Sequence, residues 1–284
     1  MSTLLRNRFE DYMTLRGFSP KTKQAYVGAV AGLAGYYRKT PDNLDNKQIQ
    51  AYLLHLIKER GLAWSSCNVV FSGLRCFYGH VLNWENTRFS IPSRPRQKKL
   101  PLVMSVEDVM RLIDATKSPK NRVLLMTVYG GGLRVGEVVR LKAGHIESER
   151  MLIRVEQGKG RKDRYTLLPR RLLTELRAYY AAYRPGEWLF FSKIKSKPMP
   201  IGTAQKVYYW AKKRAGITRG KGIHTLRHCF ATHLMDQGVD LYVIKQMMGH
   251  SAIKTTSRYL HASNQKLAKL ISPLDLSEFT KAGA

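Results

Sequence analysis

The stretch from Ile91 to Pro101 decides how the chain can be organised, because it holds three prolines and four cations in eleven residues. Proline lacks a backbone N–H and clashes with the preceding helical turn, so this stretch cannot lie inside a helix. We expect residues 91–101 to form an extended basic linker between a first domain, residues 1–90, and a second, residues 102–284. A plain spacer needs no charge, so the linker is also predicted to lie along a polyanion. Its cations are Arg94, Arg96, Lys98 and Lys99.

The basic excess extends over the whole chain, which has 49 Lys and Arg against 20 Asp and Glu, a formal net charge of +29. Such a charge indicates a polyanionic partner. Hydrophobic residues make up 44% of the chain and aromatic residues 10%, which excludes a disordered basic tail.

One long stretch of the second domain, from Trp188 to Met235, contains no carboxylate, whereas a solvated surface usually mixes both signs. This pattern favours contact with a phosphate backbone over a solvated face, because binding releases the counterions of the nucleic acid. A membrane surface is a third possibility, but no segment combines a basic face with an interfacial aromatic stripe. The first cations of the stretch are Lys193, Lys195 and Lys197.

The protein is predicted to be located in the cytoplasm. No run of about 18 apolar residues could span a membrane, and Arg6 and Arg8 interrupt the place where a signal peptide would be apolar. The three cysteines are odd in number and not spaced as a zinc site, which is typical of a reducing compartment.

The first domain is predicted to be a bundle of about four helices. Ser19 and Pro20 form an N-cap and a first helical position, and Tyr26, Val30, Leu33 and Tyr37 then follow with helical spacing. Further helices are expected over Leu4–Leu15, around Ile49–Ile57 and over Val70–Val81.

The second domain is predicted to be mainly helical with a small antiparallel sheet. Ser105 and Asp108 resemble a capping box before an apolar helix. Short strands are expected at Met151–Glu156 and Arg164–Leu168, on either side of the basic turn Gly158–Asp163. The fold class is therefore mainly α with a small antiparallel β-sheet in the second domain.

Two segments combine loops with unusual cations. Tyr129–Glu137 contains a glycine run that feeds a helix with Arg134 near its start, and glycine permits close approach to a phosphate while arginine grips it with two donors. The basic turn carries Lys159, Arg161 and Lys162, and a flexible ammonium group such as that of Lys159 is a plausible proton donor. Taken singly, neither segment distinguishes a phosphate contact from an ordinary surface loop.

Two further segments add histidines and a tyrosine. His224 and Arg227 lie three residues apart and so share a helix face. His224 and His228 also have a zinc-like spacing, but the glutamate of His-Glu-x-x-His is absent and there is no obvious cysteine ligand, so we expect no metal. His250 follows Arg227 by 23 residues, and Tyr259 follows His250 by nine.

The ordered set Arg134, Lys159, His224-x-x-Arg227, His250 and Tyr259 resembles the tyrosine recombinase (phage integrase) family, including the spacings of 23 and nine residues. Residues Phe9 to Tyr26 also resemble the family's SAM-like, DNA-clamping helical domain. Gly131 and Gly136 stand where many relatives have Thr and Ser, a departure that leaves the chemistry untouched.

The resemblance implies a site-specific recombinase whose Arg134 and Arg227 grip a phosphodiester, with His224 and His250 assisting. Tyr259 would be the nucleophile and form a covalent 3′-phosphotyrosine, Lys159 would protonate the leaving 5′-oxygen, and Glu137 would support a neighbouring group. No metal or other cofactor is implied.

The resemblance further implies a C-shaped, two-domain DNA clamp. It would work as a homo-tetramer on double-stranded DNA recombination sites, with or without accessory proteins, and exchange strands through a four-way junction. Residues 272–279 would dock on a neighbouring protomer, and the unusual charge favours a mobile-element enzyme. The alternatives are a type IB topoisomerase, which relaxes DNA without joining two sites, and a non-catalytic architectural DNA-binding protein.

Overall fold

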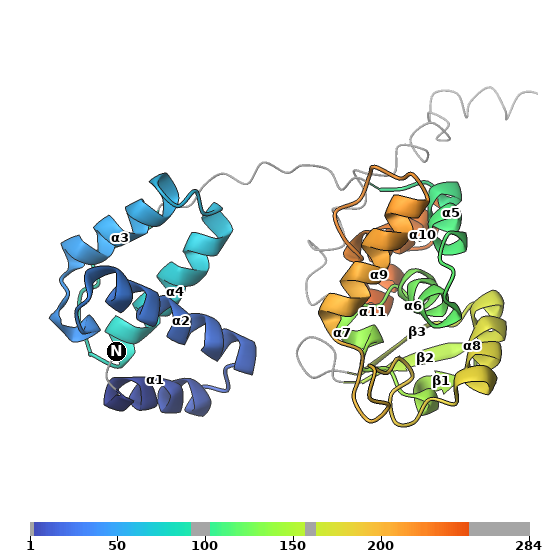
Figure 1. The fold of residues 1–284 in the computed structure, drawn as a ribbon, viewed down its shortest axis with the longest axis horizontal. Coiled ribbons are helices and arrows are strands. Elements are labelled where there is room, and N and C mark those ends of the chain that lie inside the picture. Colours follow the sequence, from blue (N-terminus) through green and yellow to red (C-terminus); the bar gives the residue numbers. More distant parts are fainter. Residues whose placement is uncertain (1–2, 92–102, 157–162, 250–284) are drawn as a thin grey trace, which may run out of the picture. The chain divides into compact units, whose positions relative to one another are not determined.

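The computed structural model describes residues 3–91, 103–156 and 163–249 (Figure 1). The chain divides into two compact units, Met1–Gln97 and Lys98–Ala284. Each unit has its own buried hydrophobic core. The predicted linker cations Arg94, Arg96, Lys98 and Lys99 lie outside the described residues. The exact domain limits and the clamp shape stay predictions.

The first unit confirms the predicted helical bundle. It consists of α1 (Thr3–Leu15), α2 (Pro20–Tyr37), a short 3-10 turn (Pro41–Asn43), α3 (Asn46–Lys58) and α4 (Trp64–His80). The Ser19 hydroxyl accepts a hydrogen bond from the backbone N–H of Thr22, 3.2 Å away, so the predicted N-cap is present. At the start of α3, Asp45 and Gln48 cap the helix reciprocally.

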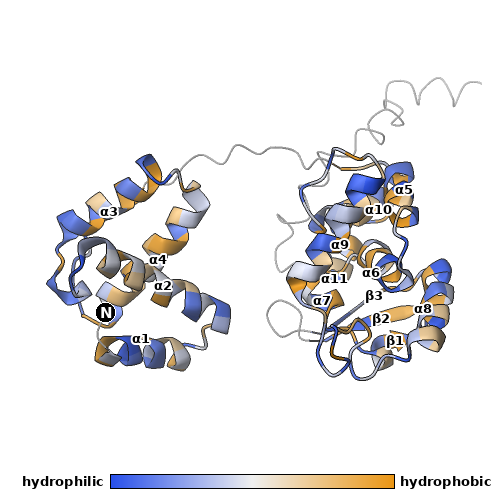
Figure 2. Cartoon of the chain, viewed as in Figure 1, coloured by the Kyte–Doolittle hydropathy of each residue, from blue (hydrophilic) through white to orange (hydrophobic). Residues whose placement is uncertain are grey.

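The core of this unit lies between its helices, which combine hydrophobic and hydrophilic residues along their lengths (Figure 2). Val30 and Leu33 are fully buried, and Tyr26 and Tyr37 pack beside them, as the spacing predicted. Helices α2 and α4 approach closely at Gly73, where an added Cβ would lie only 3.1 Å from the Cα of Tyr26.

The second unit is mainly helical with one three-stranded antiparallel sheet. Its helices are α5 (Val106–Asp114), α6 (Pro119–Gly130), α7 (Val135–Val138), α8 (Arg170–Tyr183), α9 (Ile201–Arg214), α10 (His224–Asp236) and α11 (Leu241–Met248). Ser105 caps α5 as predicted, while the Asp108 carboxylate contacts Arg111. The helix α6 is buried from Val123 to Val128 and packs against α8 and α10.

The sheet has the order β1-β2-β3, with β1 at Ile146–Glu147, β2 at Leu152–Val155 and β3 at Arg164–Leu167. The two predicted strands are β2 and β3, paired from Leu152–Leu167 to Val155–Arg164. The sequence did not predict β1, because a strand of two residues is too short to show a period-2 pattern. Among the described residues, none of the helices has the length and apolar character needed to cross a membrane.

Candidate active site

The turn after α6 delivers Arg134 to the site. Gly132 has φ +60, and a Cβ there would come within 2.3 Å of the Phe230 ring, so only glycine fits between α6 and α10. The carbonyl of Gly131 accepts a hydrogen bond from the hydroxyl of Thr166, 2.8 Å away, which ties the turn to β3. The glycines therefore have a packing role that fixes the backbone just before Arg134.

Arg134 and Glu137 are joined at the start of α7. The backbone N–H of Arg134 donates to Oε2 of Glu137 at 2.8 Å, and its Nη1 donates to Oε1 at 2.7 Å. Glu137 is almost buried, whereas the Arg134 side chain keeps 23% of its surface exposed. The carboxylate thus holds the guanidinium while leaving part of it accessible.

Arg227 and His224 enter the same site from α10. The Arg227 side chain is buried, and its Nη1 and Nη2 each donate at 2.5 Å, to the carbonyls of Gly132 and Met248. Its Nη1 also lies 3.7 Å from Oε2 of Glu137. His224, the first residue of α10, is partly covered but keeps an exposed surface, and it lines a groove together with Arg134 and Glu137.

The environment of His224 favours its neutral form. Partial burial of the ring, together with the nearby guanidinium groups of Arg227 and Arg134, lowers its pKa below the ordinary value of histidine. A neutral imidazole can donate one hydrogen bond from one ring nitrogen and accept one at the other.

Arg164 completes the cluster, although the sequence patterns did not point to it. Its Nη1 and Nη2 donate to the two oxygens of Glu137 at 2.9 and 2.7 Å. The signal that could have found it is the alternation of β3, which places Arg164 on the same face as the buried Thr166. An arginine on the inward face of a strand needs a buried counter-charge.

The end of α11 forms the other side of the cluster. The carbonyls of three consecutive residues accept hydrogen bonds from the three arginines: Met247 from Arg164 Nε at 2.8 Å, Met248 from Arg227 and Gly249 from Arg134 Nη2 at 3.0 Å. The C-terminal end of a helix carries a partial negative charge and attracts cations.

Glu137 is the shared counter-charge of this cluster. Burial alone would raise its pKa, but the hydrogen bonds and charge of Arg164 and the hydrogen bonds from Arg134 outweigh it and hold the pKa at about 2. Glu137 is therefore ionised at any physiological pH. Three guanidinium groups face one carboxylate, so the site keeps a positive excess that suits an anion such as a phosphate.

The groove beside the cluster continues along the second unit. Besides Arg134 and His224, its lining includes Lys142, His145 and Trp188. The Lys142 ammonium lies 5.0 Å from the centre of the Trp188 ring and 2.9 Å from the Glu187 carboxylate. The groove therefore offers basic and aromatic groups beside the accessible part of Arg134.

The structure brings together Arg134, Glu137, His224 and Arg227. The predicted Lys159, Arg161, Lys162, His250 and Tyr259 lie outside the described residues. Lys193, Lys195 and Lys197 are exposed in the loop between α8 and α9, where Lys195 Nζ donates to the carbonyl of Tyr183 at 3.3 Å. Among residues 3–91, 103–156 and 163–249, no group of three or more His, Cys, Asp and Glu could hold a metal ion.

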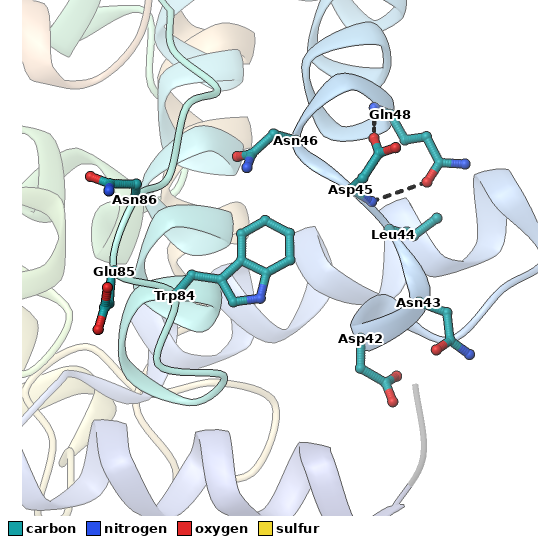
Figure 3. Close-up of a pocket in the computed structure, with 9 residues that line it drawn as sticks. All are labelled: Asp42, Asn43, Leu44, Asp45, Asn46, Gln48, Trp84, Glu85 and Asn86. Atoms are coloured by element: carbon teal, nitrogen blue, oxygen red, sulfur yellow. Dashed lines mark hydrogen bonds between the residues drawn. The ribbon is translucent and has the colours of Figure 1, made fainter.

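A second pocket lies in the first unit, where Trp84 faces the turn before α3 (Figure 3). Its polar lining includes the carboxylates of Asp42, Asp45 and Glu85, and Asp45 is engaged in capping α3. Carboxylates repel phosphates, so this pocket does not suit a nucleic-acid backbone.

Residues 103–266 match the Phage integrase family, and residues 5–87 match its N-terminal SAM-like domain. The chain belongs to the phage integrase family. It is a site-specific tyrosine recombinase, an enzyme that breaks and rejoins DNA. The predicted family, the mainly helical two-domain fold and the DNA-breaking activity are thereby confirmed, while the roles of individual residues stay predictions.

This recombinase is similar to known proteins over nearly its whole length. It is 35% identical over 277 residues to a Sinorhizobium fredii protein described as an integrase/recombinase, covering 96% of this chain and 89% of that protein. It is 33% identical to the tyrosine recombinase XerA of Thermococcus kodakarensis, covering 92% of each chain.

Solved structures share the recombinase fold. The crystal structure of a XerA recombinase matches with a TM-score of 0.53 at 25% identity, covering 99% of this chain and 98% of that one. A lambda integrase dimer bound to a core site matches with a TM-score of 0.72 at 19% identity, covering 91% of this chain and 94% of that one.

Proposed function

We propose that this recombinase cleaves DNA by attack of Tyr259 on a phosphodiester that Arg134 and Arg227 hold. The bond from phosphorus to the 5′-oxygen breaks as the bond to the tyrosine oxygen forms, which leaves a 3′-phosphotyrosine and a free 5′-hydroxyl. The observation that carries the proposal is the positive excess around Glu137, which opens onto a groove at Arg134 and His224.

The chemistry needs these groups because attack adds negative charge to a phosphorus whose oxygens are already anionic. Fixed guanidinium groups stabilise that charge without reorganising during the reaction. They also favour the ionised form of Tyr259, whose phenol has an ordinary pKa near 10. His224 would donate a hydrogen bond to a phosphate oxygen, and His250 would do the same from the segment after α11.

The covalent bond conserves the energy of the broken phosphodiester, so a 5′-hydroxyl from a second duplex can attack it and restore the backbone. We propose that this exchange passes through a four-way junction in a homo-tetramer on DNA. A structural neighbour with a TM-score of 0.71 at 19% identity is a lambda integrase tetramer bound to a Holliday junction. Residues 272–279 would link neighbouring protomers.

Other parts of the chain would hold the duplex on either side of the cleaved phosphate. We assign this role to the linker cations Arg94, Arg96, Lys98 and Lys99, to Arg161 and Lys162, and to Lys193, Lys195 and Lys197. The enzyme would act on cytoplasmic DNA as the recombinase of a mobile element, with accessory proteins where the element encodes them.

The proposal is tested first by covalent capture. Cells that express the recombinase are lysed in denaturant, and the DNA attached to the protein is sequenced to give the cleavage site. A synthetic duplex with that site and a nick beside it should then accumulate the adduct, because the short leaving strand diffuses away. Absence of any adduct would contradict the proposal, and exchange between two labelled duplexes would separate it from relaxation by a topoisomerase.

Lys159→Ala should slow cleavage of an ordinary duplex by roughly 10²–10⁴-fold, the usual contribution of a general acid. A substrate with sulfur at the bridging 5′ position needs no proton on its leaving group, so it should restore the variant to near the wild-type rate. The measurement is the single-turnover cleavage rate on both substrates. Equal defects on both would remove Lys159 from the proton-donor role.

A further inference from the structure

Arg164 belongs to the arginine cluster around Glu137, but the proposed chemistry gives it no role. It opens β3, its side chain is only 9% exposed, and its guanidinium reaches Glu137 without lining the groove. We propose that Arg164 is a positioning residue, which locks Glu137 so that Arg134 and Arg227 keep the orientation required at the cleaved phosphate. The inference rests on the proposed function, because it concerns the same site.

Arg164 holds Glu137 through both oxygens of its carboxylate. Each oxygen of the carboxylate accepts one N–H from Arg164, at 2.9 and 2.7 Å, a two-pronged geometry that fixes both the place and the plane of the carboxylate. Arg134 then adds one further hydrogen bond to each oxygen, from Nη1 and from its backbone N–H. Glu137 is thus oriented from β3 and can in turn orient Arg134.

Arg164 also fixes the end of α11. Its Nε donates to the carbonyl of Met247 at 2.8 Å, next to the carbonyls that hold Arg227 and Arg134. Its side chain lies against Gly249, where φ is +60 and an added Cβ would come within 2.8 Å of Arg164 Cδ. The same guanidinium therefore sets both the carboxylate and the backbone that the other two arginines use.

Loss of Arg164 would remove two of the hydrogen bonds that hold Glu137 and leave two acceptor positions of its carboxylate without their donors. Arg134 already donates to both oxygens, whereas Nη1 of Arg227 lies 3.7 Å from Oε2 and has room to come closer. Arg227 would then move toward the carboxylate and away from the carbonyl of Gly132, which it contacts at 2.5 Å. A displacement of about 1 Å in a positioned group can cost about 100-fold in rate.

Arg164→Ala should therefore lower the single-turnover cleavage rate on the nicked substrate about 100-fold at saturating DNA. Because Arg164 is placed away from the phosphate, the slope of binding against salt should stay unchanged, whereas a phosphate contact would change it by about 1. Arg164→Lys, which keeps the charge but not the two-pronged geometry, should cleave at an intermediate rate.

The pH profile gives a readout that a purely structural role would not move. Among the described residues, the charged groups that face Glu137 are Arg134 before α7, Arg164 on β3 and Arg227 on α10, and the titratable His224 lies beside them. Removing Arg164 takes away the main group that lowers the pKa of the buried Glu137, so this carboxyl becomes protonated at a higher pH. The rate of Arg164→Ala should then fall on acidification well before that of the wild type, and Glu137→Gln in the same variant should abolish this extra dependence.

Arg150→Ala is the matched control, because Arg150 precedes β2, is 60% exposed and pairs with Glu147. It removes the same charge near the same sheet and should cleave like the wild type. Wild-type cleavage by Arg164→Ala or by Arg164→Lys would overturn the positioning role, as would a rate loss with no change in pH profile. An adduct formed by the wild-type protein keeps the proposed function intact in those cases, whereas its absence would count against the function itself.

Discussion

Tyr259→Phe should bind the recombination site with wild-type affinity and form no covalent adduct. The substitution removes one oxygen, and that oxygen is the atom that would join the DNA, so no residual path to the same product remains. The loss should exceed that of any other single change, because the other residues stabilise the reaction while Tyr259 takes part in a bond. The adduct is measured by gel shift under denaturing conditions on the nicked substrate.

Tyr242→Phe is the matched control for this result. Tyr242 lies on α11 and is 54% exposed. The Lys245 ammonium lies 5.0 Å from the centre of its ring. The chain has 15 tyrosines, so a loss specific to position 259 must be distinguished from a general effect of removing a phenol. An adduct formed by Tyr259→Phe at the wild-type level would show that another residue is the nucleophile.

Arg227→Ala should produce the second largest effect, at least about 10²–10³-fold in the cleavage rate, the usual cost of removing one fixed donor from a developing anion. It should also lower the free energy of unfolding by about 3–5 kcal/mol, because it breaks a buried charge cluster. Arg227 is 4% exposed and bonds the carbonyls of Gly132 and Met248, which would lose their donor. The two effects are measured by single-turnover cleavage and by urea unfolding.

Arg227→Lys separates catalysis from stability. A lysine keeps one positive charge near Glu137 but lacks the planar fork that serves two carbonyls and a phosphate together. It should recover part of the lost unfolding free energy while cleavage stays far below the wild-type rate. Wild-type cleavage by this variant would contradict a two-pronged grip on the phosphate.

Much of the local structure was predictable because it depends on near neighbours in the sequence. The hydroxyl of Ser19 caps the helix three residues away, and the alternation around Met151–Leu168 gives two strands. The spacing of His224 and Arg227 on one helix face also follows from the helical repeat. Each of these features needs only a few consecutive residues.

The arrangement of the site depends on contacts between residues that are distant in the sequence, and no local sequence pattern predicts such contacts. Arg164 and Glu137 are 27 residues apart, and Arg134 reaches the carbonyl of Gly249 across 115 residues. The resemblance to a family indicated which residues act together, but it did not indicate that Arg164 donates to both oxygens of Glu137. The glycine run predicts a close approach to phosphate, which stays a prediction, and the structure shows a separate packing role of Gly132 against Phe230.

The most direct test of the account is the identity of the residue that carries the DNA. The adduct trapped on the nicked substrate is digested with nuclease and trypsin, and the peptide that retains a nucleotide is sequenced by mass spectrometry. Trypsin cleaves after Arg258 and Lys266, and the peptide between them, Tyr259–Lys266, contains Tyr259 as its one tyrosine. We expect a 3′-linked nucleotide on Tyr259, and a nucleotide on any other residue would contradict the account.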